Sequence, residues 1–227
     1  MDKQRHAIIL EALQSAIGKE NVQDSLSVMM AYHRDWLPPG VLNPVLPEFV
    51  TLPNGTEEVQ KVIRICNRYN VPFIPLGSSQ WSLTTAPNRP GTLIIDSKRM
   101  GRILDIDDKN MYAVIEPYVT MAQIHSEANR RGLYLGSPEA SAQASAMAGH
   151  VFQGMWGVGH RVGVGHRNIL AMEWVLPNGE IVRTGSWATN SGTRFFGEGP
   201  GIDLRGMLRG PAGAMGGTQP SGAIDAG

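Results

Sequence analysis

The strongest constraint on the fold is an alternation of short apolar strands with amphipathic helices over residues 56–135. After Thr56, the apolar side chains of TEEVQKVIRICNRYN recur every three or four positions, which is the spacing of one helix face. Extended apolar runs follow at 71–74, 91–97 and 112–117. Strand and helix patterns in this order predict a layered α/β or α+β fold, in which helices cover a sheet.

Local signals predict where the helices begin and end. Apolar residues between Ile8 and Ile17 follow a helical spacing, and Gly18 can end that helix. Thr56 is the expected N-cap of the next helix, since a threonine hydroxyl can accept a hydrogen bond from a free backbone amide. A further helix is expected to start at Thr120 and to end at Gly132.

Two other stretches carry clear backbone signals. Residues 35–55 contain five prolines, which forbid a regular helix and predict an extended connector. Residues 168–176 and 180–184 are predicted to form a β-hairpin, with Asn178-Gly179 as the type I′ pair between the strands.

Composition excludes several classes of protein. The chain has 20 basic and 20 acidic side chains and no formal net charge, so bulk electrostatics favours neither a nucleic acid nor an anionic membrane as a partner. Cys66 is the only cysteine, which rules out an internal disulfide framework and favours a reducing compartment. No run of about 18 apolar residues is present, so no membrane span is expected. Polar residues interrupt the apolar start of the chain, so no signal peptide is expected and the cytoplasm is the predicted location.

The stretch NVPFIPLGSSQWSL (70–83) reads as a strand that runs into a loop of small residues. Successive amides at Gly77, Ser78 and Ser79 could point into one concavity and bind phosphate oxygens. The same residues also suit an ordinary turn. The loop lacks both the GK[ST] of a nucleotide-kinase loop and a G-x-G-x-x-G fingerprint, so its residues alone leave the two interpretations open.

A tract rich in glycine and alanine covers residues 144–165. It could form a surface loop or a slot of backbone around a flat ligand, and Phe152 and Trp156 argue only against pure disorder. His150, His160 and His166 lie close together, but the tract has no H-E-x-x-H, carboxylate or cysteine, so we expect no metal site. No G-x-S-x-G elbow supports a nucleophilic serine.

Five stretches in a fixed order carry a resemblance to a known family. They are LPNGTEEVQKVIRICNRYNVPFIPLG, GTLIIDSKRMGRILDID, YAVIEPYVTMAQIHSEANRRGL, AMEWVLPNGEIVRTG and DLRGMLRGPAGAMG. Together they resemble the PCMH-type FAD-binding domain of the vanillyl-alcohol oxidase and p-cresol methylhydroxylase flavoproteins. That group also includes the FAD-linked oxidases of the glycolate oxidase and lactate dehydrogenase type. The resemblance covers roughly residues 45–216.

The resemblance implies an α+β fold of two subdomains with FAD between them. The loop after the strand at 71–74 would bind the pyrophosphate, and the tract after residue 144 would line the flavin. The residues expected by this resemblance to contact the cofactor are Pro75, Leu76, Gly77, Ser78, Ser79, Gln80, Trp81, Ser82, Pro117, Val119, Thr120, Ser145, Ala146, Met147, Gly149, His150, Gly163, Gly213 and Gly216. His160 and Arg161 are the candidates for tuning the flavin.

The chain differs from the family pattern at three places. Ser78, Ser79 and Gln80 occupy a region in which the family usually has two or three glycines, and Tyr118 replaces the usual glycine of E-P-G-V-T. Ala148-Gly149 stands where the family usually has a Gly-Gly pair.

The expected domains are an N-terminal helix and connector (1–42), the FAD-binding domain (43–217) and an irregular tail (218–227), without the cap domain of the family. We therefore expect a fragment, a truncated product or an FAD subunit that needs a partner.

The function implied by the resemblance is oxidation of a hydroxy acid or a phenolic alcohol by hydride transfer to flavin N5. The expected partners are a small-molecule substrate and an electron-acceptor protein or partner subunit. Two alternatives stay open: a non-catalytic FAD-carrying subunit that another chain completes, and a degenerate module that has lost FAD.

Overall fold

The computed structural model describes residues 2–33, 45–78, 87–135, 142–153, 168–188 and 222–225. The helical elements are α1 (Lys3–Ile17), η1 (Lys19–Asn21), α2 (Leu26–Ala31), α3 (Thr56–Arg68), η2 (Ser97–Arg99), α4 (Met121–Arg130), α5 (Ala146–Ala148) and the π-helical turn η3 (Gly149–Gln153). The strands are β1 (Val22–Gln23), β2 (Phe49–Thr51), β3 (Phe73–Leu76), β4 (Leu93–Asp96), β5 (Ile103–Asp107), β6 (Tyr112–Ile115), β7 (Ile169–Val175), β8 (Ile181–Gly185) and β9 (Gly222–Asp225).

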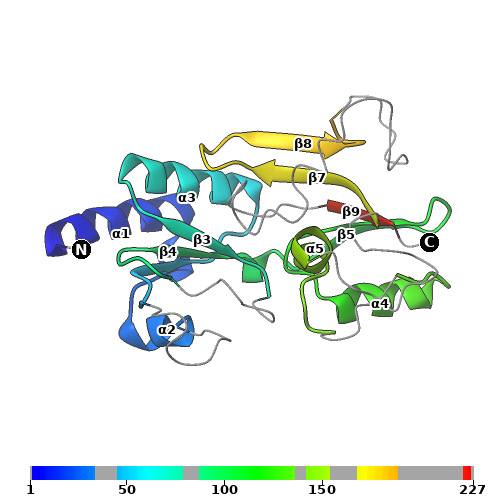
Figure 1. The fold of residues 1–227 in the computed structure, drawn as a ribbon, viewed down its shortest axis with the longest axis horizontal. Helices are drawn as coiled ribbons and strands as arrows, with labels where there is room; N and C mark the ends of the chain where they lie inside the picture. The colour runs from blue at the N-terminus through cyan, green and yellow to red at the C-terminus, as the bar shows by residue number, and fades with distance from the viewer. Residues whose placement is uncertain are drawn as a thin grey trace.

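The first subdomain is a four-stranded sheet in the order β1-β2-β4-β3, packed against α1 and α3 (Figure 1). β2, β4 and β3 are parallel, because α3 carries the chain back between β2 and β3. The apolar stripe was predicted to run from Val59 to Tyr69. Val59, Val62, Ile63 and Cys66 are buried as predicted, whereas Tyr69 follows the helix and is only partly buried against the same cluster. Burial also raises the pKa of the Cys66 thiol to about 12.

The N-terminal helix belongs to the same core. Ile9, Leu13 and Ile17 of α1 pack in one cluster with the buried face of α3, and β1 pairs with β2. Gly18 ends α1 as predicted, with a φ of 93°. The domain boundary expected near residue 43 stays a prediction, because residues 34–44 lie outside the described part of the chain.

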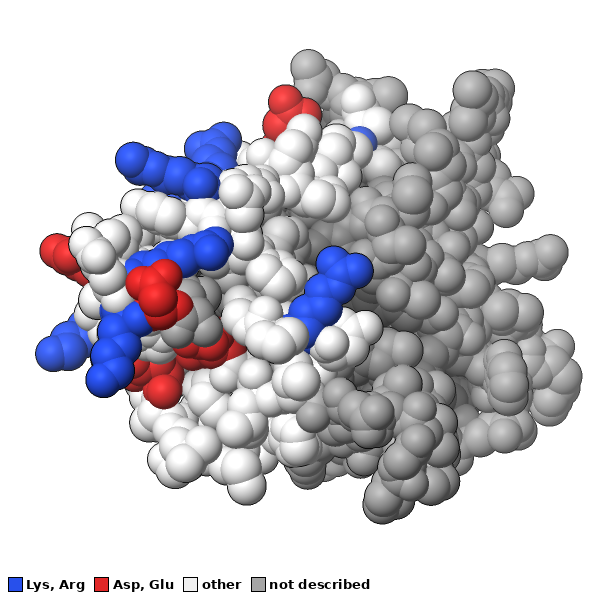
Figure 2. Space-filling model, turned by 60° about the vertical axis from the view of Figure 1, so that its left-hand side comes forward, with Lys and Arg blue, Asp and Glu red and all other residues white. Residues whose placement is uncertain are grey.

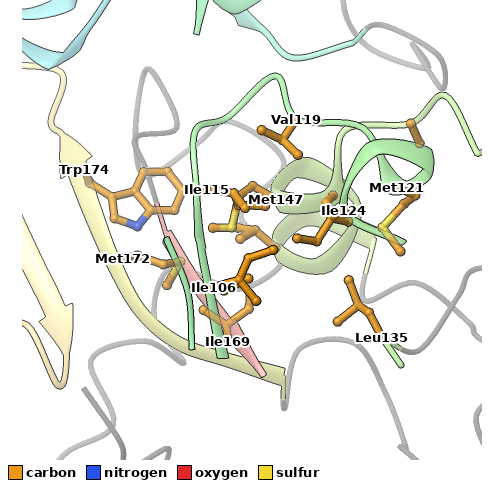
Figure 3. Packing of buried hydrophobic residues seen from close by; sticks show 14 residues of the cluster. Ile106, Ile115, Val119, Met121, Ile124, Leu135, Met147, Ile169, Met172 and Trp174 are labelled. Carbon is orange, nitrogen blue, oxygen red and sulfur yellow. The ribbon is translucent and has the colours of Figure 1, made fainter. Parts of the chain in front are cut away.

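The second subdomain is an antiparallel sheet in the order β5-β6-β9-β7-β8, covered by α4 and α5. Trp174 and Met172 of β7, Ile115 of β6 and Ile124 of α4 meet in its core (Figure 3). The two sheets lie side by side along the long axis of the molecule (Figure 1). The predicted α+β class, with a subdomain built around each sheet, is confirmed.

β9 differs from the irregular tail that we expected at 218–227. Gly222–Asp225 pairs with β6 on one side and with β7 on the other, so it lies inside the second sheet. Four residues carry too little alternation to show a strand in the sequence. Their pairing comes from two neighbouring strands that offer backbone donors and acceptors on both sides.

Two local predictions need correction. Gly55, and not Thr56, is the N-cap of α3, and the Thr56 hydroxyl instead donates to Glu173 Oε1 at 2.8 Å. The hairpin between β7 and β8 is confirmed, but its type I′ turn is wrong, because Gly179 alone in this turn has a positive φ, 83°. Leu176 O accepts from the Gly179 amide and Leu176 N donates to Glu180 O, which makes a three-residue loop with glycine in the left-handed position.

The α3 helix also joins the two subdomains. Gln60 Nε2 donates to Gly179 O at 2.6 Å, and Asn67 Nδ2 donates to Pro177 O at 2.7 Å. A Cβ at Gly179 would lie 2.9 Å from Arg64 Cγ, so the hairpin tip approaches the helix closely. These contacts fix the hairpin of the second sheet against the first.

No described helix has the length and apolar character needed to cross a bilayer.

On the face shown in Figure 2, basic and acidic side chains are interspersed over the described surface. An anion bound to the described residues therefore depends on local donors more than on a broad field of one sign.

Candidate functional site

Three segments that are distant in sequence meet at Ser145. Its amide donates to Ser78 Oγ at 2.8 Å, and its hydroxyl donates to the carbonyl of Pro117. The amide of Ala146 donates to Val119 O at 2.8 Å. The loop after β3, the turn after β6 and the start of α5 therefore form one constellation.

The loop after β3 leaves the carboxyl end of a parallel sheet. β3 and β4 pair in register there, with Leu76 opposite Asp96. Ser97 Oγ donates to Leu76 O at 2.8 Å and so fixes the last carbonyl before Gly77. The carboxyl ends of parallel strands are where open sheets of this kind bind ligands. Sequence reasoning missed Ser97, although a hydroxyl directly after an apolar strand is a signal that could have suggested it.

Gly77 lies against the start of α5. A Cβ placed on Gly77 would lie 3.4 Å from the Cβ atoms of both Ser145 and Ala148, at the close limit of ordinary van der Waals contact. Close approach of the two backbones therefore depends on small side chains on both sides. Such a wall of small residues leaves amides and hydroxyls, and not bulky side chains, to face a ligand.

A buried carboxylate holds the turn after β6. Glu116 is 5% exposed and accepts from the Arg102 amide at 2.8 Å and from Arg102 Nη2 at 2.6 Å. The Tyr118 amide donates to Met100 O at 2.9 Å. The turn that carries Pro117 is thereby tied to the segment just before β5, a connection that the sequence did not reveal.

Thr120 lies at the predicted helix start, and the structure makes it the N-cap of α4. Its hydroxyl accepts from the Gln123 amide at 3.3 Å, and the Gln123 side chain accepts from the Thr120 amide at 2.8 Å. The reciprocal pair is a capping box, which satisfies two backbone donors at the helix start. Thr120 also forms a β-bridge with Ser145, so the cap lies directly beside the constellation.

His150 is 1% exposed, and its Nδ1 lies 2.6 Å from Ala146 O. A carbonyl oxygen can only accept, so Nδ1 carries the hydrogen in this contact. The ring is thus held with a fixed orientation within the first turns after Ser145.

A charged cluster lies at the carboxyl end of the parallel strands, as does the loop after β3. Tyr32 of the segment after α2 donates its hydroxyl to Asp96 Oδ2 at 2.6 Å, and Lys98 Nζ lies 3.3 Å from the same oxygen. Burial, with the neighbouring Asp96 carboxylate, raises the pKa of Tyr32 to about 12. The phenol therefore stays protonated and acts as a donor to Asp96 at neutral pH.

The remaining predicted residues divide into three groups. Leu76, Val119, Ala146 and Met147 have buried side chains that pack in the cores, so only their backbones can reach a ligand; Val119 and Met147 are visible in Figure 3. Pro75 lies within β3, and the Gly149 amide donates to Ser145 O at 2.9 Å. The predicted residues outside the described part of the chain are Ser79, Gln80, Trp81, Ser82, His160, Arg161, Gly163, Gly213 and Gly216.

Other kinds of site find less support. Within the described ranges, no three His, Cys, Asp or Glu side chains cluster as metal ligands. An open surface pocket between β5 and α4 is lined by Ile103, Leu104, Asp105, Ile106, Glu127 and Arg131. None of the predicted site residues lines it, so the constellation at Ser145 remains the candidate site.

Comparison with known proteins connects this geometry to a family. A family described as an FAD binding domain matches residues 47–185. Glycolate oxidase subunit GlcD of Bacillus subtilis is 28% identical over 92% of this chain and 42% of that protein. The mitochondrial D-lactate dehydrogenase [cytochrome] of Arabidopsis thaliana is 30% identical over 75% of this chain and 29% of that protein.

Further relatives extend the same picture. The 4-cresol dehydrogenase [hydroxylating] flavoprotein subunit of Pseudomonas putida is 29% identical over 86% of this chain and 38% of that protein. Among solved structures, p-cresol methylhydroxylase with substrate bound superimposes with a TM-score of 0.84 at 24% identity, over 99% of this chain and 44% of that chain. Alkyldihydroxyacetonephosphate synthase gives 0.78 at 19% identity, over 96% and 40%. These structures share the fold, and the chain spans less than half the length of each of these relatives.

Proposed function

Because this chain belongs to the family of FAD binding domains, we propose that it is the FAD-holding part of a flavin-dependent oxidoreductase. The observation that carries the proposal is the meeting of the loop after β3, the turn after β6 and the start of α5 at Ser145. Each of these segments resembles a part of the family that contacts the cofactor.

The residues present fit FAD. A pyrophosphate carries negative charge, and a chain with no net charge can hold it with backbone amides and hydroxyls gathered in one place. Gly77 and Ser78 supply backbone amides at the carboxyl end of β3, and a Cβ on Gly77 would lie 3.4 Å from the Cβ atoms of Ser145 and Ala148, so glycine suits this wall. The backbone from Ala146 to His150 is the surface proposed for the flavin.

Bound FAD supplies the redox chemistry, which we propose is acceptance at flavin N5 of a hydride from a carbinol carbon. The names of two relatives mention glycolate and D-lactate, so a small hydroxy acid, or a phenolic alcohol, is the proposed substrate class. The 4-cresol named in a third relative has no carbinol carbon and would give its hydride from the benzylic methyl carbon. The described residues at the site would bind the cofactor and orient it. Ser145 and Thr120 use their hydroxyls in bonds within the protein, and His150 is held through Nδ1.

The first test is binding. We expect the purified chain to take up one FAD, measured by quenching of flavin fluorescence in a titration of the cofactor-free protein. Riboflavin, which lacks the pyrophosphate together with the adenosine, is the control ligand, and it should bind at least about tenfold more weakly if this half of FAD, with its pyrophosphate on the loop after β3, contributes to binding. Failure to bind FAD would remove the proposal. Equal affinity for the two ligands would remove the phosphate assignment while leaving a flavin site.

The second test separates an enzyme from a carrier. Anaerobic addition of glycolate, D-lactate or 4-cresol to the FAD-loaded chain should bleach the flavin absorbance if the chain carries the oxidase chemistry. A flavin that is bound but not bleached favours a second candidate, an FAD-carrying subunit that acts with another chain. The engagement of Ser145, Thr120 and His150 in bonds within the protein favours that candidate, because it suits binding more than proton transfer.

A further inference from the structure

We propose that Ser145 is a positioning residue that fixes the loop of the first subdomain against the turn of the second, and so sets the affinity for FAD. The inference rests on the proposed function. Ser145 uses its amide toward the loop after β3 and its hydroxyl toward the turn after β6. One residue therefore holds both walls of the proposed cofactor site.

The hydroxyl of Ser145 acts within the protein. It donates to Pro117 O and accepts from the Ala148 amide at 3.1 Å, and the residue is 1% exposed. A serine hydroxyl has a single hydrogen, so the bond to Pro117 leaves none for a phosphate oxygen. Ser145 therefore acts on the cofactor through the segments that it holds.

The link to the first subdomain runs through Ser78. Its hydroxyl oxygen accepts the Ser145 amide across 67 positions of sequence, a bond that a glycine at position 78 could not make. The family pattern usually has two or three glycines in this region, whereas in this chain the Ser78 side-chain oxygen provides an anchor for the loop. Ser97 donates to the carbonyl of Leu76, so the loop is fixed on both sides of Gly77.

Loss of the Ser145 hydroxyl should leave the subdomains folded and joined. The contacts from α3 to the β7–β8 hairpin persist without it, through Gln60 with Gly179 and through Asn67 with Pro177. Removal of the hydroxyl leaves the Pro117 carbonyl without that partner and frees the turn to shift relative to the loop. The expected defect is therefore in cofactor placement rather than in folding.

The experiment measures FAD binding to the cofactor-free chain for Ser145→Ala, Ser78→Ala and Ser78→Thr. We expect Ser145→Ala to raise the dissociation constant at least about tenfold, which corresponds to about 1.4 kcal/mol. Ser78→Ala should raise it at least about fivefold, and Ser78→Thr, which keeps the acceptor oxygen, should stay within about twofold of the wild type. The visible circular dichroism of FAD at saturation should change in both alanine variants, because the flavin surroundings shift.

Thr51→Val is the matched control. Thr51 donates its buried hydroxyl to Ile94 O at 3.1 Å in the first sheet, so the change removes a similar bond away from the site. It should lower thermal stability but leave the FAD dissociation constant within about twofold of the wild type. An unchanged affinity in Ser145→Ala, or equal loss in Thr51→Val, would overturn the inference.

The remaining outcomes also decide between the role of Ser145 and the proposed function. If Ser145→Ala does not fold, the Ser78 pair carries the test, and equal affinity of Ser78→Ala and Ser78→Thr overturns the inference. If the wild-type chain does not bind FAD, the proposed function fails and this inference fails with it. Wild-type binding with unaffected variants removes only the role of Ser145.

Discussion

The Glu116 carboxylate offers a sharp test of what holds the turn after β6. Glu116→Gln removes the negative charge at nearly constant volume. The carboxylate is 5% exposed and accepts from the Arg102 amide at 2.8 Å, and a buried hydrogen bond to a charged group contributes about 1.5–3 kcal/mol. The Arg102 side chain is 65% exposed, so its ionic attraction adds little. We expect unfolding about 1.5–3 kcal/mol easier, a fall of about 3–12 °C in Tm for a chain of this size.

The matched control is Glu127→Gln. Glu127 also pairs with an arginine at 2.6 Å, through Arg130 Nη1, but its side chain is 38% exposed. The same substitution at the same distance should therefore cost at most about 0.5 kcal/mol. Thermal unfolding followed by circular dichroism gives both values. Equal losses in Tm would refute the reasoning that burial of the carboxylate, and not the length of the ion pair, decides its contribution.

Three further predictions concern stability. Burial alone would lower the pKa of His6, but hydrogen bonds to Asp24 and Glu48 outweigh burial and raise that pKa. The contribution of protonated His6 to the stability of the fold is therefore complete below about pH 6.5, and it is lost as pH rises through the folded-state pKa. The difference in urea midpoint between wild type and His6→Gln should therefore shrink between about pH 6 and pH 9, and a constant difference would contradict this. Thr120→Ala should cost about 1 kcal/mol in urea unfolding, and Thr120→Ser should restore most of it; equal loss in both would exclude the cap. Met111 has a φ of 54° and is 46% exposed, so Met111→Gly should gain about 0.5–1 kcal/mol, and a loss of stability would show that the turn carries no strain.

The sequence predicted what depends on neighbouring residues. The buried stripe Val59, Val62, Ile63 and Cys66 follows from helical spacing, and the helix start at Thr120 was predicted, although its capping box with Gln123 came from the structure. The turn type was harder to predict from the sequence. Asn178-Gly179 suits type I′, but Pro177 also belongs to the loop, which has three residues with glycine alone in the left-handed position.

What depends on distant pairing could not be predicted from the residues alone. β9 forms because β6 and β7 flank it, and its own four residues carry no clear pattern. The contact of Ser145 with Ser78 joins positions 67 apart, and Glu116 reaches Arg102 across a strand pair. The resemblance to a family identified the segments of the site, whereas the structure supplied the bonds that bring the described ones together.

The most direct test of the central claim is amide hydrogen exchange of the chain with and without FAD. One cofactor site formed by three segments predicts that FAD slows exchange together in Gly77–Ser78, Val119–Thr120 and Ser145–His150. Amides on the far side of the first subdomain, such as those of α1, should exchange at the same rate with and without FAD. Protection of one segment alone, or protection elsewhere with these three unchanged, would contradict the account.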